Sequence, residues 1–134
     1  MILVDTNLLL RAILQDDIVQ AKATRAFFEQ ARDRRVPLVV HELALAEVVW
    51  VLQGRGWSRD QISITLLEIC ADARLAVRDM AVVEAAAGLY QSNNVSYIDA
   101  FHAAYANVHG MEGILSFDQD FDRLKVKRFE PRID

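Results

Sequence analysis

Four acidic side chains stand in otherwise apolar surroundings, far apart along the chain: Asp5, Glu47, Asp99 and Asp118. Clustered carboxylates repel one another and raise one another's pKa unless a cation neutralises them. Oxygen ligands alone favour Mg²⁺ or Mn²⁺ over zinc, copper or iron. Such a site binds a phosphate ester, lowers the pKa of a bound water for in-line attack and shields the leaving oxygen. If folding brings the four acids together, the pattern predicts metal-dependent hydrolysis of a phosphate ester.

Asp5 directly follows the apolar run Met1–Val4. This run is typical of a strand buried on both faces of a parallel sheet. Asp5 is then expected at the carboxyl end of that strand, where open α/β sheets hold their ligands. Thr6 or Asn7 can cap the helix that follows. The alternative is that Asp5 is itself only a helix cap.

Glu47 is the only charged residue between Leu43 and Leu52. Its neighbours at helical spacing are apolar, so we expect this helix to be largely buried. An isolated buried carboxylate is costly unless it is paired or binds a metal. A buried ion pair with a distant arginine is the alternative to a metal ion.

Asp99 is the third residue after Ser96, which is the spacing of a capping box. Its carboxylate can bond back to the amide of the cap and still offer one oxygen. A helix N-terminus accommodates that negative charge. His102 lies one turn further on and could touch the same site, although a histidine on an apolar helix is more often a packing residue.

Asp118 follows the apolar run Gly113–Phe117, which we predict to be a strand. Asp120 and Asp122 are alternative candidates for this position, or solvated neighbours. We favour Asp118 because of its distance from the strand and from Ser116. Asp122 lies one helical turn from Asp118, so it can share the site as an outer contact.

Strands and helices alternate along the chain, which favours an α/β protein with a parallel sheet and right-handed crossovers. We expect a three-layer α/β/α fold with a central parallel sheet of four to five strands, in a single domain over residues 1–134. The expected strands are 1–4, 36–40, 75–77, 113–117 and, at the edge, 126–129. The expected helices are 8–14, 18–34, 42–53, 58–71, 79–90 and 96–108, the last three counted from their N-caps.

The composition excludes several classes of protein. The single cysteine excludes an internal disulfide and a cysteine-rich zinc site, and it indicates a reducing compartment. No apolar stretch reaches the ~18 residues of a membrane helix, and no basic leader precedes the first strand, so we expect a cytoplasmic protein. The net charge of −4 argues against a general nucleic-acid coat protein. Setting four acids aside for a metal leaves acids and bases balanced, which permits a nucleic-acid substrate.

At these acids the chain resembles the PIN-domain family and, within it, the VapC-type ribonuclease toxins of toxin–antitoxin pairs. The resemblance covers essentially the whole chain and rests on four motifs: Val4-Asp5-Thr6-Asn7, Ala46-Glu47-Val48, Tyr97-Ile98-Asp99-Ala100 and Ser116-x-Asp118-x-x-Phe121. It implies that the four acids are catalytic and together hold one or two Mg²⁺ or Mn²⁺ ions. It also implies that Thr6, Asn7 and Ser116 support the ligands or contact metal-bound water.

The resemblance further implies an activity and partners. The expected activity is metal-dependent endoribonuclease cleavage of RNA, as the toxin of a toxin–antitoxin pair. A homodimer and a cognate antitoxin are the expected protein partners. Basic residues that could contact RNA phosphates are Arg11, Arg55, Arg59 and Arg123.

Two readings compete with this one. The first is a catalytically silent PIN-like module that serves protein interaction. The second is a phosphorelay receiver domain, which also gathers acids at strand ends but needs a lysine after a late strand. Here Lys125 and Lys127 come after the last carboxylate, which disfavours the receiver.

Overall fold

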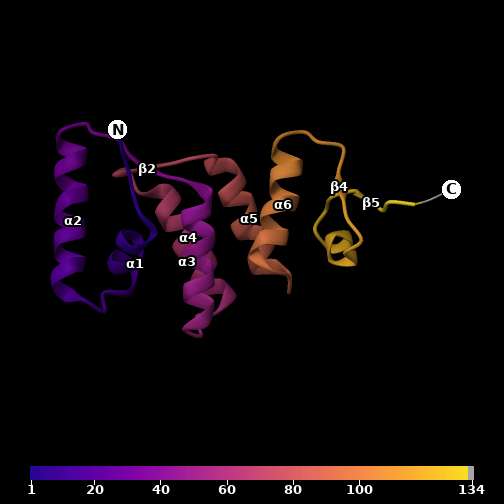
Figure 1. Ribbon diagram of the computed structural model, residues 1–134, viewed down its shortest axis with the longest axis horizontal. Helices are drawn as coiled ribbons and strands as arrows, with labels where there is room; N and C mark the ends of the chain where they lie inside the picture. Colours follow the sequence, from indigo (N-terminus) through magenta and orange to yellow (C-terminus); the bar gives the residue numbers. More distant parts are fainter. Residues whose placement is uncertain (133–134) are drawn as a thin grey trace. The chain divides into compact units, whose positions relative to one another are not determined.

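The computed structural model describes residues 1–132, and the chain forms two compact units (Figure 1). Unit 1 comprises residues 1–57 and 68–79, and unit 2 comprises residues 58–67 and the chain from residue 80 onwards. The division falls within helix α4 (Arg59–Ala71), whose first two turns belong to unit 2.

Unit 1 is built on a three-stranded parallel sheet in the order β1-β2-β3. Its strands are β1 (Ile2–Leu3), β2 (Leu38–Val40) and β3 (Leu75–Val77). Its complete helices are α1 (Thr6–Leu14), α2 (Ile18–Asp33) and α3 (Glu42–Gly54). Parallel neighbours need crossover connections, and α1 with α2 forms the first of them, between β1 and β2. Leu38 and Val40 of the central strand are buried, so β2 forms part of the core of this unit.

The first strand is exposed, which corrects the prediction of a strand buried on both faces. Ile2 and Leu3 are 43% and 63% exposed, whereas Val4, which follows them, is buried. The reason is position, because β1 lies at the edge of the three-stranded sheet, where it pairs with β2. A short apolar run does not distinguish a central strand from an edge strand.

Unit 2 is organised around a pair of packed helices, α5 (Met80–Ser92) and α6 (Tyr97–Val108) (Figure 1). Their buried residues include several alanines, which let two helix backbones approach closely: Ala86 and Ala87 on α5, Ala103 and Ala104 on α6. After α6 the chain forms strand β4 (Ile114–Leu115), the short 3₁₀ helix η1 (Gln119–Arg123) and strand β5 (Arg128–Phe129).

The two strands of unit 2 pair in parallel. Ile114 N donates to Lys127 O at 2.8 Å, and Ser116 N donates to Phe129 O at 2.9 Å. This short ladder fixes the point at which the chain leaves β4 and turns into η1.

The structure confirms the mixed α/β class and the parallel pairing of strands. It does not confirm a central sheet of four to five strands, because the strands divide into a sheet of three and a sheet of two. Helix α1 begins at Thr6 rather than at Leu8, since Asp5 is its cap. Within residues 1–132, none of the helices combines the length and the apolar character that crossing a membrane requires.

Candidate active site

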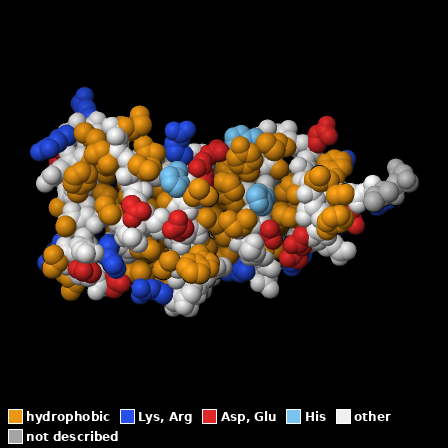
Figure 2. Space-filling view, in the orientation of Figure 1, with side chains coloured by type: hydrophobic (Ala, Val, Ile, Leu, Met, Phe, Trp, Pro, Cys, Tyr) orange, Lys and Arg blue, Asp and Glu red, His pale blue; other side chains and the backbone are white. Residues whose placement is uncertain are grey.

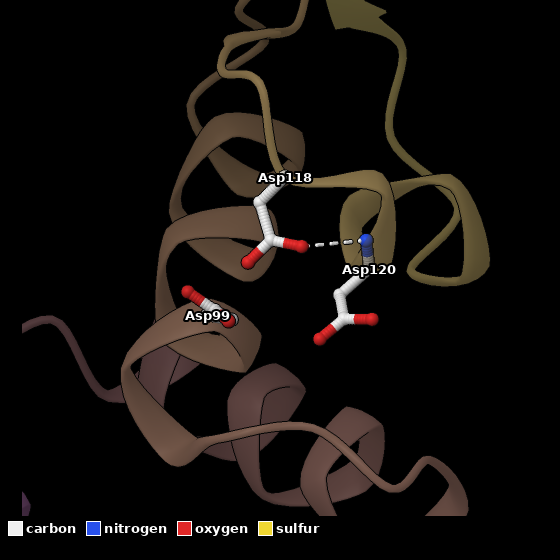
Figure 3. A group of neighbouring side chains, drawn as sticks. All are labelled: Asp99, Asp118 and Asp120. Carbon is white, nitrogen blue, oxygen red and sulfur yellow. Dashed lines mark hydrogen bonds between the residues drawn. The ribbon is translucent and has the colours of Figure 1, made fainter.

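Three carboxylates of unit 2 gather at one place: Asp99, Asp118 and Asp120 (Figure 3). One oxygen of each lies within 4.8 Å of one oxygen of each of the others. Asp99 comes from α6, whereas Asp118 and Asp120 come from the turn into η1. Figure 2 shows Asp and Glu side chains gathered on the surface near α6 and η1.

Asp99 is held by the start of α6. The Ser96 hydroxyl caps this helix and accepts a hydrogen bond from Asp99 N at 3.1 Å, which is one of the two bonds of the predicted capping box. The half-buried Asp99 carboxylate therefore projects from the first turn, where the helix dipole stabilises negative charge. Tyr97 and Ala100 on either side are buried, which orients this turn against the rest of unit 2.

Asp118 is held by its own cap. Its Oδ1 accepts from Asp120 N at 2.9 Å, and its backbone N donates to the Ser116 hydroxyl at 3.0 Å. These two bonds turn the chain sharply after β4. As a result the side chains of Asp118 and Asp120 lie on the same side of the turn (Figure 3). Arg123 Nη2 pairs with Asp120 Oδ1 at 2.8 Å, which partly offsets the charge of the cluster.

Asp122 is engaged elsewhere. Arg128 donates to it from Nε at 2.9 Å and from Nη2 at 3.3 Å. These hydrogen bonds lower the pKa of the Asp122 carboxyl below its usual value and raise the pKa of Arg128. Of the three candidates that the sequence offered, Asp118 and Asp120 thus join Asp99. The sequence offered Asp120 only as an alternative to Asp118 or as a solvated neighbour, whereas the structure places it beside Asp118 in the cluster.

Asp5 lies in unit 1, directly after β1, and its carboxylate is exposed. Its Oδ2 accepts from Asn7 N at 3.2 Å, so Asp5 is the N-cap of α1. The helix cap that was predicted as Thr6 or Asn7 is therefore Asp5 itself. Thr6 is buried in the first turn, and Asn7 is exposed.

Glu47 is also in unit 1, and the prediction that it is buried is wrong. The buried side of α3 carries Leu45, Val48 and Leu52 among others. Glu47 is exposed together with Leu43 and Trp50, which are 71% and 76% exposed. The argument from desolvation therefore does not apply to this carboxylate.

A hollow of about 460 Å³ adjoins the acidic cluster. Ser116 lines it, and so does His102, for which the sequence favoured a packing role. Its other side chains include two aromatic and two aliphatic groups: Tyr105, Phe121, Met111 and Ile114. Asp99 and Asp118 thus line a hollow whose other walls are partly apolar.

Each predicted phosphate contact has a partner. Arg11 pairs with Asp16 at 3.0 Å, and Arg55 approaches the same carboxylate at 3.5 Å. Arg59 donates to the carbonyl of Tyr90 in the last turn of α5 and to that of Val95 in the α5–α6 connection. Arg123 is the one of the four that is bound to a member of the acidic cluster.

The donor set of the cluster fits a hard divalent cation, because carboxylate oxygens are the ligands such ions prefer. Ligand oxygens lie roughly 2.0–2.1 Å from Mg²⁺, so two of them on opposite sides of the ion are about 4.2 Å apart. Asp99, Asp118 and Asp120 already present oxygens within 4.8 Å of one another, so these three carboxylates would hold such an ion.

Comparison with known proteins identifies the family of the chain. The chain is similar to "VapC ribonuclease" of Aquifex aeolicus (strain VF5), with 26% identity over 130 residues that make up 96% of each chain. No solved structure matches it significantly. The sequence profile of the PIN domain matches residues 2–127, nearly the whole chain. The protein therefore belongs to the PIN-domain family.

Proposed function

We propose that this protein is a metal-dependent endoribonuclease that hydrolyses RNA phosphodiester bonds as the toxin of a toxin–antitoxin pair. The observation that carries the proposal is the meeting of Asp99 and Asp118, from two separate elements of unit 2, in one acidic cluster. Membership of the PIN-domain family and similarity to a VapC ribonuclease support the same reading.

In this proposal the metal ligands and catalytic residues are Asp5, Glu47, Asp99 and Asp118, and Asp120 joins them. A bound Mg²⁺ or Mn²⁺ would supply an activated water and would stabilise charge on the leaving oxygen. Asp99 and Asp118 are held for this task by the cap of α6 and by the cap of η1. Ser116, Thr6 and Asn7 are proposed to orient the ligands or metal-bound water.

The partners follow from the toxin reading. We propose an RNA substrate, inhibition by a cognate antitoxin, a homodimer and a cytoplasmic location. A single PIN-like domain over residues 1–134, with four to five strands in its central sheet, also stays a proposal.

The test is cleavage of cellular RNA by the purified chain with Mg²⁺ or Mn²⁺, and again with a chelator. We expect cleavage that the chelator stops and that Asp99→Asn and Asp118→Asn each abolish while the chain stays folded. Glu84→Gln is the matched control, since Glu84 is an exposed acid of unit 2 that lies outside the cluster. Full cleavage by a well-folded Asp99→Asn variant would overturn the proposal. Absence of any cleavage by the unchanged chain would favour the catalytically silent interaction module instead.

A further inference from the structure

The guanidinium of Arg59, on α4, is bound to the connection between α5 and α6. Its Nη1 donates to Tyr90 O at 3.0 Å and to Val95 O at 2.8 Å, and its Nη2 donates to Asn94 Oδ1 at 3.2 Å. Its central carbon also lies 4.4 Å from the centroid of the Tyr90 ring. Hydrogen bonds from a charged donor are stronger than neutral ones, and the planar guanidinium fixes their directions. Arg59 therefore links the start of α4 to the end of α5 and to the residues before α6, all within unit 2.

The start of α4, from which the Arg59 side chain extends, is itself fixed by hydrogen bonds. Ser58 N donates to Gln61 Oε1 at 2.9 Å, and Gln61 N donates to the Ser58 hydroxyl at 3.1 Å. The two bonds form a complete capping box at the start of α4. Arg59 thus extends from a helix end whose orientation is set by its own backbone.

One contact of Arg59 leads through the backbone to Asp99. Val95, whose carbonyl accepts the shortest of the three hydrogen bonds, directly precedes Ser96. The Ser96 hydroxyl in turn caps α6 by accepting from Asp99 N. Holding Val95 in place therefore holds the cap that orients the first turn of α6.

A second contact leads to the same turn through aromatic rings. The Tyr90 ring, on which the Arg59 guanidinium lies, packs edge-on against the Tyr97 ring, with centroids 6.0 Å apart and planes at 81°. Tyr97 is buried and is the first residue of α6. Both contacts thus end within one turn of the carboxylate of Asp99.

We propose that Arg59 is a positioning residue for Asp99: it holds the first turn of α6 where the Asp99 carboxylate meets Asp118. The inference rests on the proposed function, in which Asp99 is a metal ligand. Groups that orient a ligand without touching the metal typically cost 10- to 100-fold in metal affinity when removed. Loss of the guanidinium of Arg59 should therefore weaken metal binding by about tenfold, the lower end of that range, because the cap of α6 stays in place.

The test measures Mn²⁺ affinity of the RNA-free full chain by calorimetry or by electron paramagnetic resonance. Arg59→Ala removes all contacts of the guanidinium, whereas Arg59→Lys keeps the charge and the stem but loses the planar fork. We expect about tenfold weaker binding for Arg59→Ala and an intermediate affinity for Arg59→Lys. Circular dichroism checks that both variants are folded. If Arg59→Ala does not fold, the Mn²⁺ affinity of Arg59→Lys provides the test.

Arg74 provides a matched control. Like Arg59, it makes several side-chain hydrogen bonds and lies near an aromatic ring: it donates to the carboxylates of Asp72 at 2.8 Å and Glu29 at 3.1 Å, and it lies 5.8 Å from the centroid of the Phe28 ring. None of these residues is a proposed metal ligand, and none of them holds the start of α6. Arg74→Ala should lower the melting temperature and leave the Mn²⁺ affinity unchanged.

Three results would overturn the inference. One is Mn²⁺ binding by folded Arg59 variants that equals binding by the unchanged chain, while Asp99→Asn loses it; the proposed function would then stand without the inference. Another is an equal loss of Mn²⁺ affinity in Arg59→Ala and Arg74→Ala, which would show that the loss comes from lower stability of the whole chain. The last is absence of Mn²⁺ binding by the unchanged chain, which removes the proposed function and this inference together.

Discussion

Asp99 and Asp118 place carboxylate oxygens within 4.8 Å of each other, although one projects from the first turn of α6 and the other follows β4. Two carboxylates at this separation repel each other, and the cost rises as water is excluded. The fold holds them there through two local hydrogen bonds, from Asp99 N to the Ser96 hydroxyl and from Asp118 N to the Ser116 hydroxyl. A divalent cation between them would attract both carboxylates and so offset their mutual repulsion.

The two acids beyond Asp118 should behave differently. Asp120→Asn removes a member of the cluster and should weaken Mn²⁺ binding. Asp122→Asn should leave that affinity unchanged and lower the melting temperature, because it breaks the pair that ties Arg128 to η1. Calorimetric titration with Mn²⁺ and thermal unfolding of both variants separate the two roles. Loss of Mn²⁺ affinity in Asp122→Asn alone would show that the wrong acid has been assigned to the cluster.

Removal of Arg123 should tighten metal binding. Its guanidinium pairs with Asp120 at 2.8 Å and therefore competes with a cation for that carboxylate. Exposed pairs of this kind contribute roughly 0.2–1 kcal/mol, which corresponds to about 1.4- to 5-fold in affinity. Titration of Arg123→Ala with Mn²⁺ measures the gain, and Arg132→Ala, an exposed arginine nearer the chain end, is the control. Weaker binding by Arg123→Ala would contradict this competition.

Gly113 should tolerate no side chain. A Cβ there would collide with the carbonyl oxygen of Lys127 and lie 3.0 Å from an atom of the Phe129 ring. The two backbones cannot separate without loss of the hydrogen bond from Ile114 N to Lys127 O. Gly113→Ala should therefore destabilise the chain by about 1–3 kcal/mol in urea unfolding.

Gly88 is the control for that substitution. It lies in α5 with open space around it, so Gly88→Ala should stabilise the chain by about 0.5–1 kcal/mol through helix propensity. Equal effects of the two substitutions would show that the close approach at Gly113 does not matter.

The pair of Asp72 and Arg74 should contribute to acid unfolding. Hydrogen bonds from Arg74 lower the pKa of the Asp72 carboxyl below its ordinary value of 3.8. A carboxyl whose pKa is lowered by folding stabilises the folded chain fully above its unfolded-state pKa, and this stabilisation is lost as the pH falls through the folded-state pKa. Melting temperatures between pH 6 and pH 2 should therefore fall less steeply below about pH 4 in Asp72→Asn than in the unchanged chain. The control is Glu68→Gln, which replaces an exposed acid of the same unit.

Local signals in the sequence predicted the caps well. Ser58 and Ser96 both cap the helices for which they were predicted. A cap depends on residues three or four positions apart, so the information is contained in a short stretch of chain. The same reasoning identified Asp99 and the position of Asp118 after a strand.

Properties that depend on tertiary packing were less accessible. The spacing of Leu43, Glu47 and Trp50 puts them on one face of the helix, so the charge of Glu47 could have marked that face as the exposed one. The long apolar run around them obscured that face. The place of Asp120 had no such signal, since it depends on how η1 turns back toward α6. Strands of two or three residues likewise leave their place in a sheet unspecified.

The most direct measurement is a double-mutant cycle on Mn²⁺ affinity with Asp99→Asn, Asp118→Asn and the combined variant, each without RNA. If both carboxylates hold one ion, each single substitution should weaken binding strongly, and the combined loss should differ from the sum of the two. Both single variants binding Mn²⁺ as tightly as the unchanged chain would contradict the account.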